Sequence, residues 1–301
     1  MQQAAVVAEG GRPGSPRARR LPFLLAPALA FLVVFLALPL LGLFRTSLYP
    51  GDRSFDSAGF SLHQYAKFLA DSYYLGVLAE TIGFGIAAAF ASLLIGFPIG
   101  YSLARLPAEK RRWRLIVVIL PLTLSLVVVV FGWLVVLGRN GLANSILVGL
   151  GLAEGPQRLL FNRTAVLVVL VQQFLPFMIL SVMSVVTQIS PALEQAAANL
   201  RANRFTTMRR VVLPLAMPGI LSGLTLVFIL SVSAFITPRL IGGARVQMLG
   251  SLIFEQVMAI LNWPFGAAMA FVLLVITLAM TMGVNTLLAG RFAAKGVVRA
   301  R

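Results

Sequence analysis

Residues 190–220, SPALEQAAANLRANRFTTMRRVVLPLAMPGI, decide how this chain is organised. The segment is the only long polar and basic interruption between two very apolar segments in the second half of the sequence. Ser190 can cap a helix, and Pro191 fits its first turn. Glu194 then lies near the positive end of the helix dipole. The alanines that follow predict a smooth helix surface that another protein can approach closely.

A second short helix is expected from Arg204 to Leu213. Phe205, Met208 and Val212 recur at helical spacing and fall on one face of it. Pro214 is expected to end this helix. Two short helices outside the membrane that share an apolar face indicate a docking element.

The composition indicates an integral membrane protein. The chain has 301 residues, of which 59% are hydrophobic and 11% are charged, whereas a soluble domain has about 25% charged residues. It has no cysteine, which excludes disulfides and thiolate metal sites. The net charge of +16 does not indicate nucleic-acid binding, because the basic residues cluster at the ends of apolar runs, where they fix orientation in a membrane.

Six apolar runs are long enough to cross a bilayer. We expect an all-α protein with spans at about 21–44, 75–106, 115–137, 164–189, 215–236 and 264–288. Residues 21–290 would form the transmembrane domain, between basic tails at 1–20 and 291–301. The first run could instead be a signal peptide, but its cleavage-like triplet Ala28-Leu29-Ala30 lies within the apolar run, which favours an uncleaved anchor. In the second span, Gly96 and Gly100 form a pair that permits close helix packing.

The distribution of basic residues predicts the orientation in the membrane. Six spans place both ends of the chain on one side. That side receives 17 of the 25 Lys and Arg residues, and the other side receives eight. Because the more positive side is usually cytoplasmic, we expect both termini and the 190–214 segment to face the cytoplasm, where ATP is available.

The sequence lacks the motifs of an enzyme. No G-x-x-x-x-G-K-[ST] loop is present, so ATP and Mg²⁺ would have to be bound by a partner. A single histidine, His63, and no cysteine leave no metal cluster. No serine has a His/Asp arrangement that its spacing could support. We therefore expect no catalytic residue, metal or cofactor in this chain.

Polar side chains within apolar spans are costly, so they commonly face a bundle interior or a solute path. The candidate path residues are Glu80, Gln172, Gln173, Ser231, Ser233 and Glu255. For the serines, a hydrogen bond within their own helix is the alternative. For the two glutamines the alternative is interhelical packing, and Glu80 can simply reach the membrane interface.

The 190–220 segment also resembles the EAA loop of ABC-importer permeases. That loop reads E-A-A, three residues, glycine and then, after a fixed gap, Leu-Pro. Gln195, Ala196 and Ala197 occupy the E-A-A positions, Leu200 precedes the glycine position, and Leu213-Pro214 closes the motif. The resemblance implies that this segment couples the protein to an ATPase, through Glu194, Gln195, Ala196, Ala197, Leu200, Arg201, Leu213 and Pro214.

Two residues depart from the EAA pattern. Gln195 stands where the pattern has an acid, although Glu194 lies one residue earlier, and Arg201 stands in place of the glycine. Glycine would allow a left-handed turn between the two helices. Because arginine adopts that conformation poorly, we expect the bend to move to Asn199 or Asn203.

Residues 137–152 and 238–266 look like the spermidine/putrescine branch of these permeases, so the resemblance covers most of residues 20–290. It implies a type I importer fold in which two permease chains surround the path. Two ATPase subunits would lie below it and a periplasmic substrate-binding protein above it. The branch also contains carriers of opines, aminophosphonates and iron, so it does not fix the solute.

We therefore expect a permease subunit of an ATP-driven importer in a bacterial inner membrane, paired with a related but non-identical permease chain. An ion-coupled carrier is the alternative, but it would normally need acidic or histidine relays in the membrane, and only Glu80 is close. The expected solute is small and polar, either a polyamine or amino-acid-like. Glu80 and Glu255 could attract a cation at the outer mouth, whereas eight basic residues against five acidic ones on that side keep anionic and zwitterionic solutes open.

Overall fold

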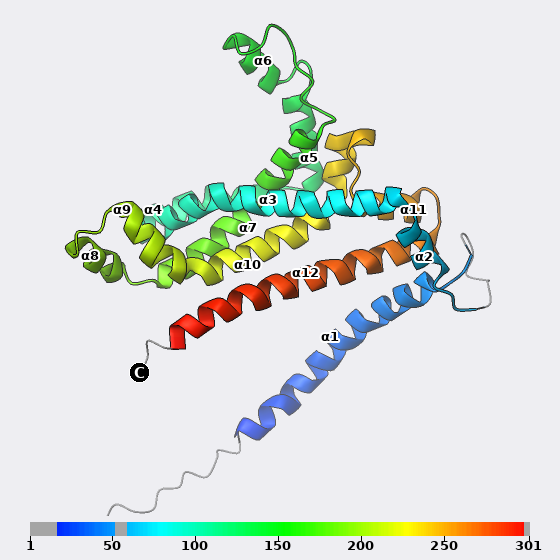
Figure 1. Cartoon of the computed structure of the whole chain (residues 1–301), viewed down its shortest axis with the longest axis horizontal. Coiled ribbons are helices and arrows are strands. Elements are labelled where there is room, and N and C mark those ends of the chain that lie inside the picture. Colours follow the sequence, from blue (N-terminus) through cyan, green and yellow to red (C-terminus); the bar gives the residue numbers. More distant parts are fainter. Residues whose placement is uncertain (1–16, 52–58, 298–301) are drawn as a thin grey trace, which may run out of the picture.

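The computed structural model describes residues 17–51 and 59–297, and its regular structure there is entirely helical. Six helical stretches in this part of the chain are long and apolar enough to cross a membrane, as the sequence predicted. The bundle runs lengthwise across Figure 1, with α1 leaning away from it. Its long helices are α1 (Arg17–Ser47), α3 (Ser72–Ala104), α7 (Arg163–Gln188), α10 (Leu213–Val232) and α12 (Trp263–Val297).

Helix α7 packs between α3 and α10, and glycines on both neighbours make this possible. A methyl group added to Gly100 of α3 would lie 2.8 Å from the carbonyl oxygen of Ile179. One added to Gly219 of α10 would lie 2.7 Å from the carbonyl oxygen of Ser181. The predicted close approach at Gly96 and Gly100 is therefore confirmed, because an added methyl group would collide with the α7 backbone at Gly100 and with the Met178 side chain, 2.7 Å away, at Gly96.

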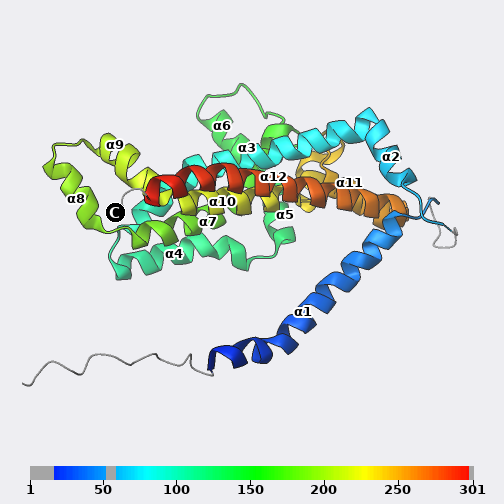
Figure 2. The same ribbon diagram turned by 60° about the horizontal axis from the view of Figure 1, so that its bottom comes forward.

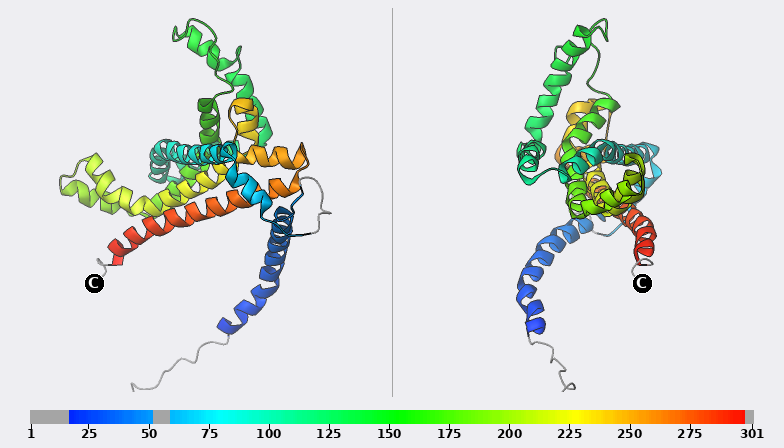
Figure 3. Two further views of the ribbon diagram at one scale, coloured as in Figure 1. Left: turned by 45° about the vertical axis from the view of Figure 1, so that its right-hand side comes forward. Right: turned by 90° about the vertical axis from the view of Figure 1, so that its left-hand side faces the viewer.

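The prediction that residues 115–137 form one continuous membrane-spanning helix is wrong. The structure divides it into α4 (Ala108–Thr123) and α5 (Leu126–Leu137), with extended backbone at Leu124 and Ser125 between them. Pro121 lies just before the break, where it removes one backbone donor. Helix α5 leads to the short α6 (Leu142–Gly149), and both project from the bundle on the side opposite to α1 (Figures 1 and 3).

Pro214 does not end a helix, contrary to the sequence prediction. Helix α9 (Arg204–Thr207), the π-turn Met208–Val212 and α10 form one uninterrupted helical stretch. In the π-turn the N–H of Leu213 bonds to the carbonyl of Met208, one residue further back than in an α-helix. This wider turn accommodates the proline, so the predicted second short helix and the fifth span merge.

The two ends of the bundle carry different short helices (Figure 2). Helices α2 (His63–Ala70) and α11 (Leu249–Met258) lie at one end, and α8 (Pro191–Asn199) and α9 lie at the other. Two short turns, Pro238–Gly242 and Gly243–Arg245, lead into α11. Of the predicted basic tails, residues 1–16 and 298–301 lie outside the described residues, whereas residues 17–20 belong to α1 and residues 291–297 belong to α12.

Replacing Gly100 with alanine should destabilise the bundle by about 1–3 kcal/mol, because the added methyl group collides with the α7 backbone. Gly76 lies on the same helix with nothing within 4 Å of the added atom, so Gly76→Ala is the matched control. Thermal unfolding of the purified protein in detergent measures both. Equal melting temperatures for the two variants would contradict the packing described here.

Candidate functional site

Helix α8 begins as the sequence predicted. The Ser190 hydroxyl accepts a hydrogen bond from the N–H of Ala192, at 3.3 Å, and Pro191 occupies the first turn. Glu194 follows in that turn. The local signals of a capping serine and a proline are therefore sufficient to start this helix.

The bend that ends α8 lies at Arg201, so the prediction that it moves to Asn199 or Asn203 is wrong. Arg201 has a φ of 59°, whereas Asn199 belongs to α8 and Asn203 caps α9 with a φ of −72°. The bend lies at Arg201 because this geometry lets two backbone N–H groups donate hydrogen bonds to the last carbonyls of α8. Arg201 N–H bonds to Ala198 O at 2.9 Å, and the next N–H bonds to Ala197 O at 3.1 Å. This pair of bonds is the Schellman motif, which requires a left-handed residue at this position.

The exposed surface of the 190–214 segment is smaller than predicted. Gln195 and Ala196 are exposed. Leu200 and Phe205 are also exposed, with exposed fractions of 84% and 73%, although both side chains are apolar. Val212, however, is 1% exposed and packs inside the chain. The expected common face of Phe205, Met208 and Val212 is therefore wrong. The free apolar surface belongs to α8 and the start of α9.

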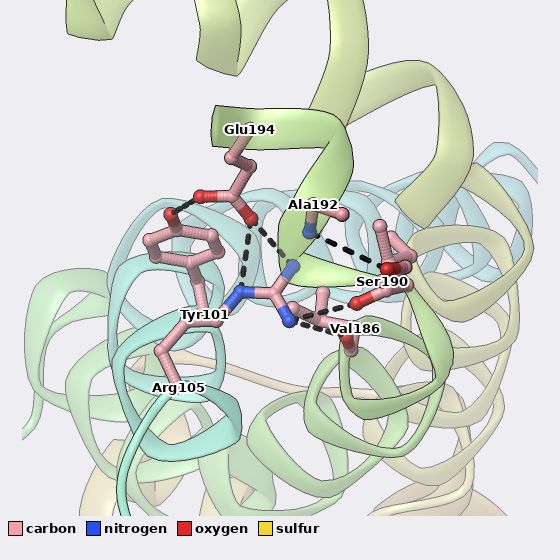
Figure 4. Close-up of polar contacts among 7 residues, drawn as sticks. Tyr101, Arg105, Val186, Ser190, Ala192 and Glu194 are labelled. Carbon is pink, nitrogen blue, oxygen red and sulfur yellow. Dashed lines mark hydrogen bonds and ion pairs between the residues drawn. The ribbon is translucent and has the colours of Figure 1, made fainter. Parts of the chain in front are cut away.

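One arginine joins this segment to the bundle. Arg105, at the end of α3, donates through Nε to Glu194 Oε1 at 2.9 Å and pairs with the same oxygen through a terminal nitrogen (Figure 4). Its other terminal nitrogen donates to the carbonyls of Ile189, at 2.9 Å, and Val186, at 3.3 Å. Tyr101 donates its hydroxyl proton to Glu194 Oε2 at 2.6 Å.

These contacts form a clamp, which we define as Tyr101, Arg105 and Glu194. The side chains of Arg105 and Glu194 are 19% and 21% exposed, so water screens their attraction only in part. The arginine also bonds to the carbonyl of Ile189, the residue that caps α7, and shares the Val186 carbonyl with the N–H of Ile189. The sequence analysis chose Glu194 but missed Tyr101 and Arg105, although Arg105 is the first basic residue at the end of the second predicted span.

Gln172 and Gln173 lie in the interior of α7 and each is tied to another element. The indole N–H of Trp133, on α5, donates to Gln172 Oε1 at 2.9 Å. The Thr237 hydroxyl, after α10, donates to Gln173 Oε1 at 2.9 Å. Both glutamines line one cavity. The sequence had no signal for either partner, because the contacts span 39 and 64 residues.

Glu80 lies near the start of α3 and is paired with a cation. Arg163, the first residue of α7, donates to Glu80 Oε1 at 2.8 Å. The two residues border a separate cavity of about 400 Å³ with Phe84 and Leu167. Glu80 is therefore not an unpaired negative charge.

The other candidate path residues lie apart from the glutamines. Ser231 is fully buried and its hydroxyl has no hydrogen-bond partner among the described residues. Ser233 follows the end of α10 and borders a third cavity with Phe235 and Phe254. Glu255 lies on α11, half-buried. The described residues contain no cluster of three potential metal ligands.

Comparison with known proteins identifies the family. Residues 96–292 match the family described as the binding-protein-dependent transport system inner membrane component. The chain is 34% identical to the spermidine/putrescine transport system permease protein PotB of Escherichia coli (strain K12), covering 85% of this chain and 92% of that protein. Its identity to PotB of Salmonella typhimurium (strain LT2) is also 34%, over 86% and 88% of the two chains.

This chain belongs to the binding-protein-dependent transport permeases. The structure of a bacterial ABC transporter that imports alginate matches it with a TM-score of 0.66 at 17% identity, covering 90% of this chain and 95% of that one. At that identity the match shows the fold alone. The permease is a multi-pass membrane protein and a transport subunit, and the family does not favour the ion-coupled carrier.

Removing the clamp should loosen α8 in the permease. Arg105→Gln removes the donors to Glu194 Oε1 and to the Ile189 carbonyl and leaves Tyr101 to hold the carboxylate, which should cost about 2 kcal/mol and speed amide exchange across Pro191–Asn199 about 30-fold. Hydrogen exchange followed by mass spectrometry measures this. Arg112→Gln, at an exposed position beyond α3, is the matched control.

Swapping the charges should not restore the clamp. In Arg105→Glu with Glu194→Arg, the ion pair can reform, but a carboxylate at 105 cannot donate to the carbonyls of Val186 and Ile189. Full protection of α8 in the double variant would contradict the role of these two bonds.

Proposed function

We propose that this permease forms half of the solute path of an ATP-driven importer and that its 190–214 segment docks on the ATPase. The observation that carries the proposal is the clamped α8. This helix is anchored to the bundle through Glu194, while Gln195, Ala196 and Leu200 are left exposed to a partner. A rigidly held helix with a small-residue, apolar surface is suited to transmit movement between two proteins.

The complex would contain two ATPase subunits, a second permease chain related to but not identical with this one, and a periplasmic substrate-binding protein. ATP and Mg²⁺ would bind the ATPase, which fits the lack of a phosphate-binding loop in this sequence. The family description, which names dependence on a binding protein and an inner membrane, supports this assembly.

The α8 end of the bundle would face the cytoplasm, together with both termini. The supporting observation is the excess of Lys and Arg on that side, 17 against eight. The α2 end, with α6 and α11, would then face the periplasm and receive the solute.

The solute would be small and polar, either a polyamine or amino-acid-like. The names of the PotB relatives support a polyamine. The ion pair between Glu80 and Arg163 weakens the argument that free acidic charge attracts a cation, because this carboxylate is already neutralised. Gln172, Gln173, Ser231, Ser233 and Glu255 stay proposals for the path, and the glutamines have the strongest geometric support because they share a cavity.

A bulky charge on the exposed face of α8 should prevent docking. Ala196→Glu would bury an unpaired carboxylate against the ATPase, so we expect at least about a tenfold loss of ATP-driven uptake and of ATPase recovered with the permease. Ala108→Glu makes the same change at an exposed position at the start of α4 and should behave as wild type. Normal uptake by Ala196→Glu would refute docking through this face.

The orientation can be tested with single cysteines, because the chain has none of its own. Glu109 and Glu154 are both exposed and lie on opposite sides in the proposed topology. In intact spheroplasts, Glu154→Cys should react with a membrane-impermeant thiol reagent, and Glu109→Cys should react only after lysis. The reverse pattern would invert the topology.

A further inference from the structure

A small cavity lies where α4 gives way to α5. Its volume is about 200 Å³, and it is walled by the two helix ends, by α7 and by one residue of α10. Gln172 and Gln173 are its only polar lining side chains, and the others include Pro121, Leu124 and Phe177. The glutamines lie about 14 Å along α7 from its first residue, so the cavity is well inside the membrane-crossing part.

The hydrogen bonds of the two glutamines fix which way their amides face. An indole N–H can only donate, so Gln172 must direct its Oε1 toward Trp133 and its NH₂ group elsewhere. In the structure the Thr237 hydroxyl donates to Gln173 Oε1, although a hydroxyl, unlike an indole N–H, could also accept. Neither NH₂ group donates to any other described residue, and neither nitrogen is sealed off by protein. The cavity is therefore lined by two amides whose acceptors are occupied and whose donors are free.

The helix break adds two partial charges of opposite sign. The last turn of α4 has carbonyls without helical partners, and the first turn of α5 has N–H groups that no side chain caps, since Ser125 makes no capping bond. Non-helical backbone at membrane depth is tolerated where it is buried in protein or lines a cavity. Broken helices elsewhere bind cations at the carbonyl end of the first half and anionic groups at the N-terminus of the second half.

We propose that this cavity binds a zwitterionic, amino-acid-like solute. The solute's carboxylate accepts hydrogen bonds from the NH₂ groups of Gln172 and Gln173, beside the N-terminus of α5, and its ammonium lies against the carbonyl end of α4. No acidic side chain lines the cavity, so a polyamine would lose its hydration there without gaining a carboxylate partner. This inference rests on the proposed transport function and narrows its solute.

The test compares amino acids with the amines left after their decarboxylation, because each pair differs only in the carboxylate. Ornithine with putrescine, lysine with cadaverine, and arginine with agmatine are measured by equilibrium binding of radiolabelled solute to the detergent-purified permease–ATPase complex. We expect at least one amino acid to bind about tenfold or more tightly than its amine. If every amine binds as tightly as its amino acid, the proposal is overturned.

Substitution at the amides makes the test specific to this cavity. Gln172→Glu and Gln173→Glu each replace an NH₂ donor by an acceptor of the same shape, so each should weaken binding of the preferred amino acid about tenfold or more while sparing its amine. Gln157→Glu makes the same change at an exposed position in the connection after α6 and should change neither. Unchanged amino-acid binding in both cavity variants would overturn the proposal.

Trp133→Phe keeps an aromatic side chain at this position but removes the indole N–H that orients Gln172. In proteoliposomes that hold the whole complex and its binding protein, this variant should raise KM for the amino acid several-fold at unchanged kcat, provided that its melting temperature matches wild type. An unchanged KM contradicts the orienting role of Trp133. Wild-type complex that shows no ATP-driven uptake of any solute would instead refute the proposed function, whereas preferential uptake of an amine would refute only this site.

Discussion

The pairing of Arg105 with Glu194, in which two guanidinium nitrogens bond to one carboxylate oxygen, is the interaction on which the arrangement of the α8 end depends. Helix α8 is only nine residues long and makes its closest backbone approaches to α9 and the π-turn that follow it. Nothing in its own sequence would hold it at a fixed angle to the membrane-crossing helices. The clamp supplies that angle, because one planar guanidinium bonds to α8 on one edge and to the last carbonyls of α7 on another.

The glycine contacts extend this rigidity along the bundle. Helices α3 and α10 both approach the α7 backbone through glycines, so the three helices are in close contact and leave little free space between them. Arg105 lies at the end of α3, and its carbonyl partners lie at the end of α7. A displacement of this pair of helices would therefore carry α8 with it, as the proposed docking on an ATPase requires.

The sequence alone was sufficient to predict the features that depend on local chemistry or on hydrophobic periodicity. Five of the six predicted spans match single long helices, the capping by Ser190 is confirmed, and the pair Gly96 and Gly100 packs as expected. It was insufficient where distant residues decide the outcome. The contact of Tyr101 with Glu194 spans 93 residues, and no local pattern reveals it. The bend at Arg201 was mispredicted because local backbone preference was weighed without the carbonyls that the bend satisfies.

Prolines show the same limit of local reasoning. Pro98, Pro176 and Pro218 lie inside α3, α7 and α10, which continue through them, whereas the helix containing Pro121 stops two residues later. An interior proline costs a helix about 3 kcal/mol or more. Helices α3, α7 and α10 are buried against one another, whereas α4 has no buried residue and α5 has only Val130. Burial alone does not decide the outcome, because α1 continues through Pro27 and Pro39 with almost no buried residue among those described. Broken backbone then lies beside the only two glutamines in the interior of α7, and this juxtaposition gives an otherwise apolar cavity two polar side chains.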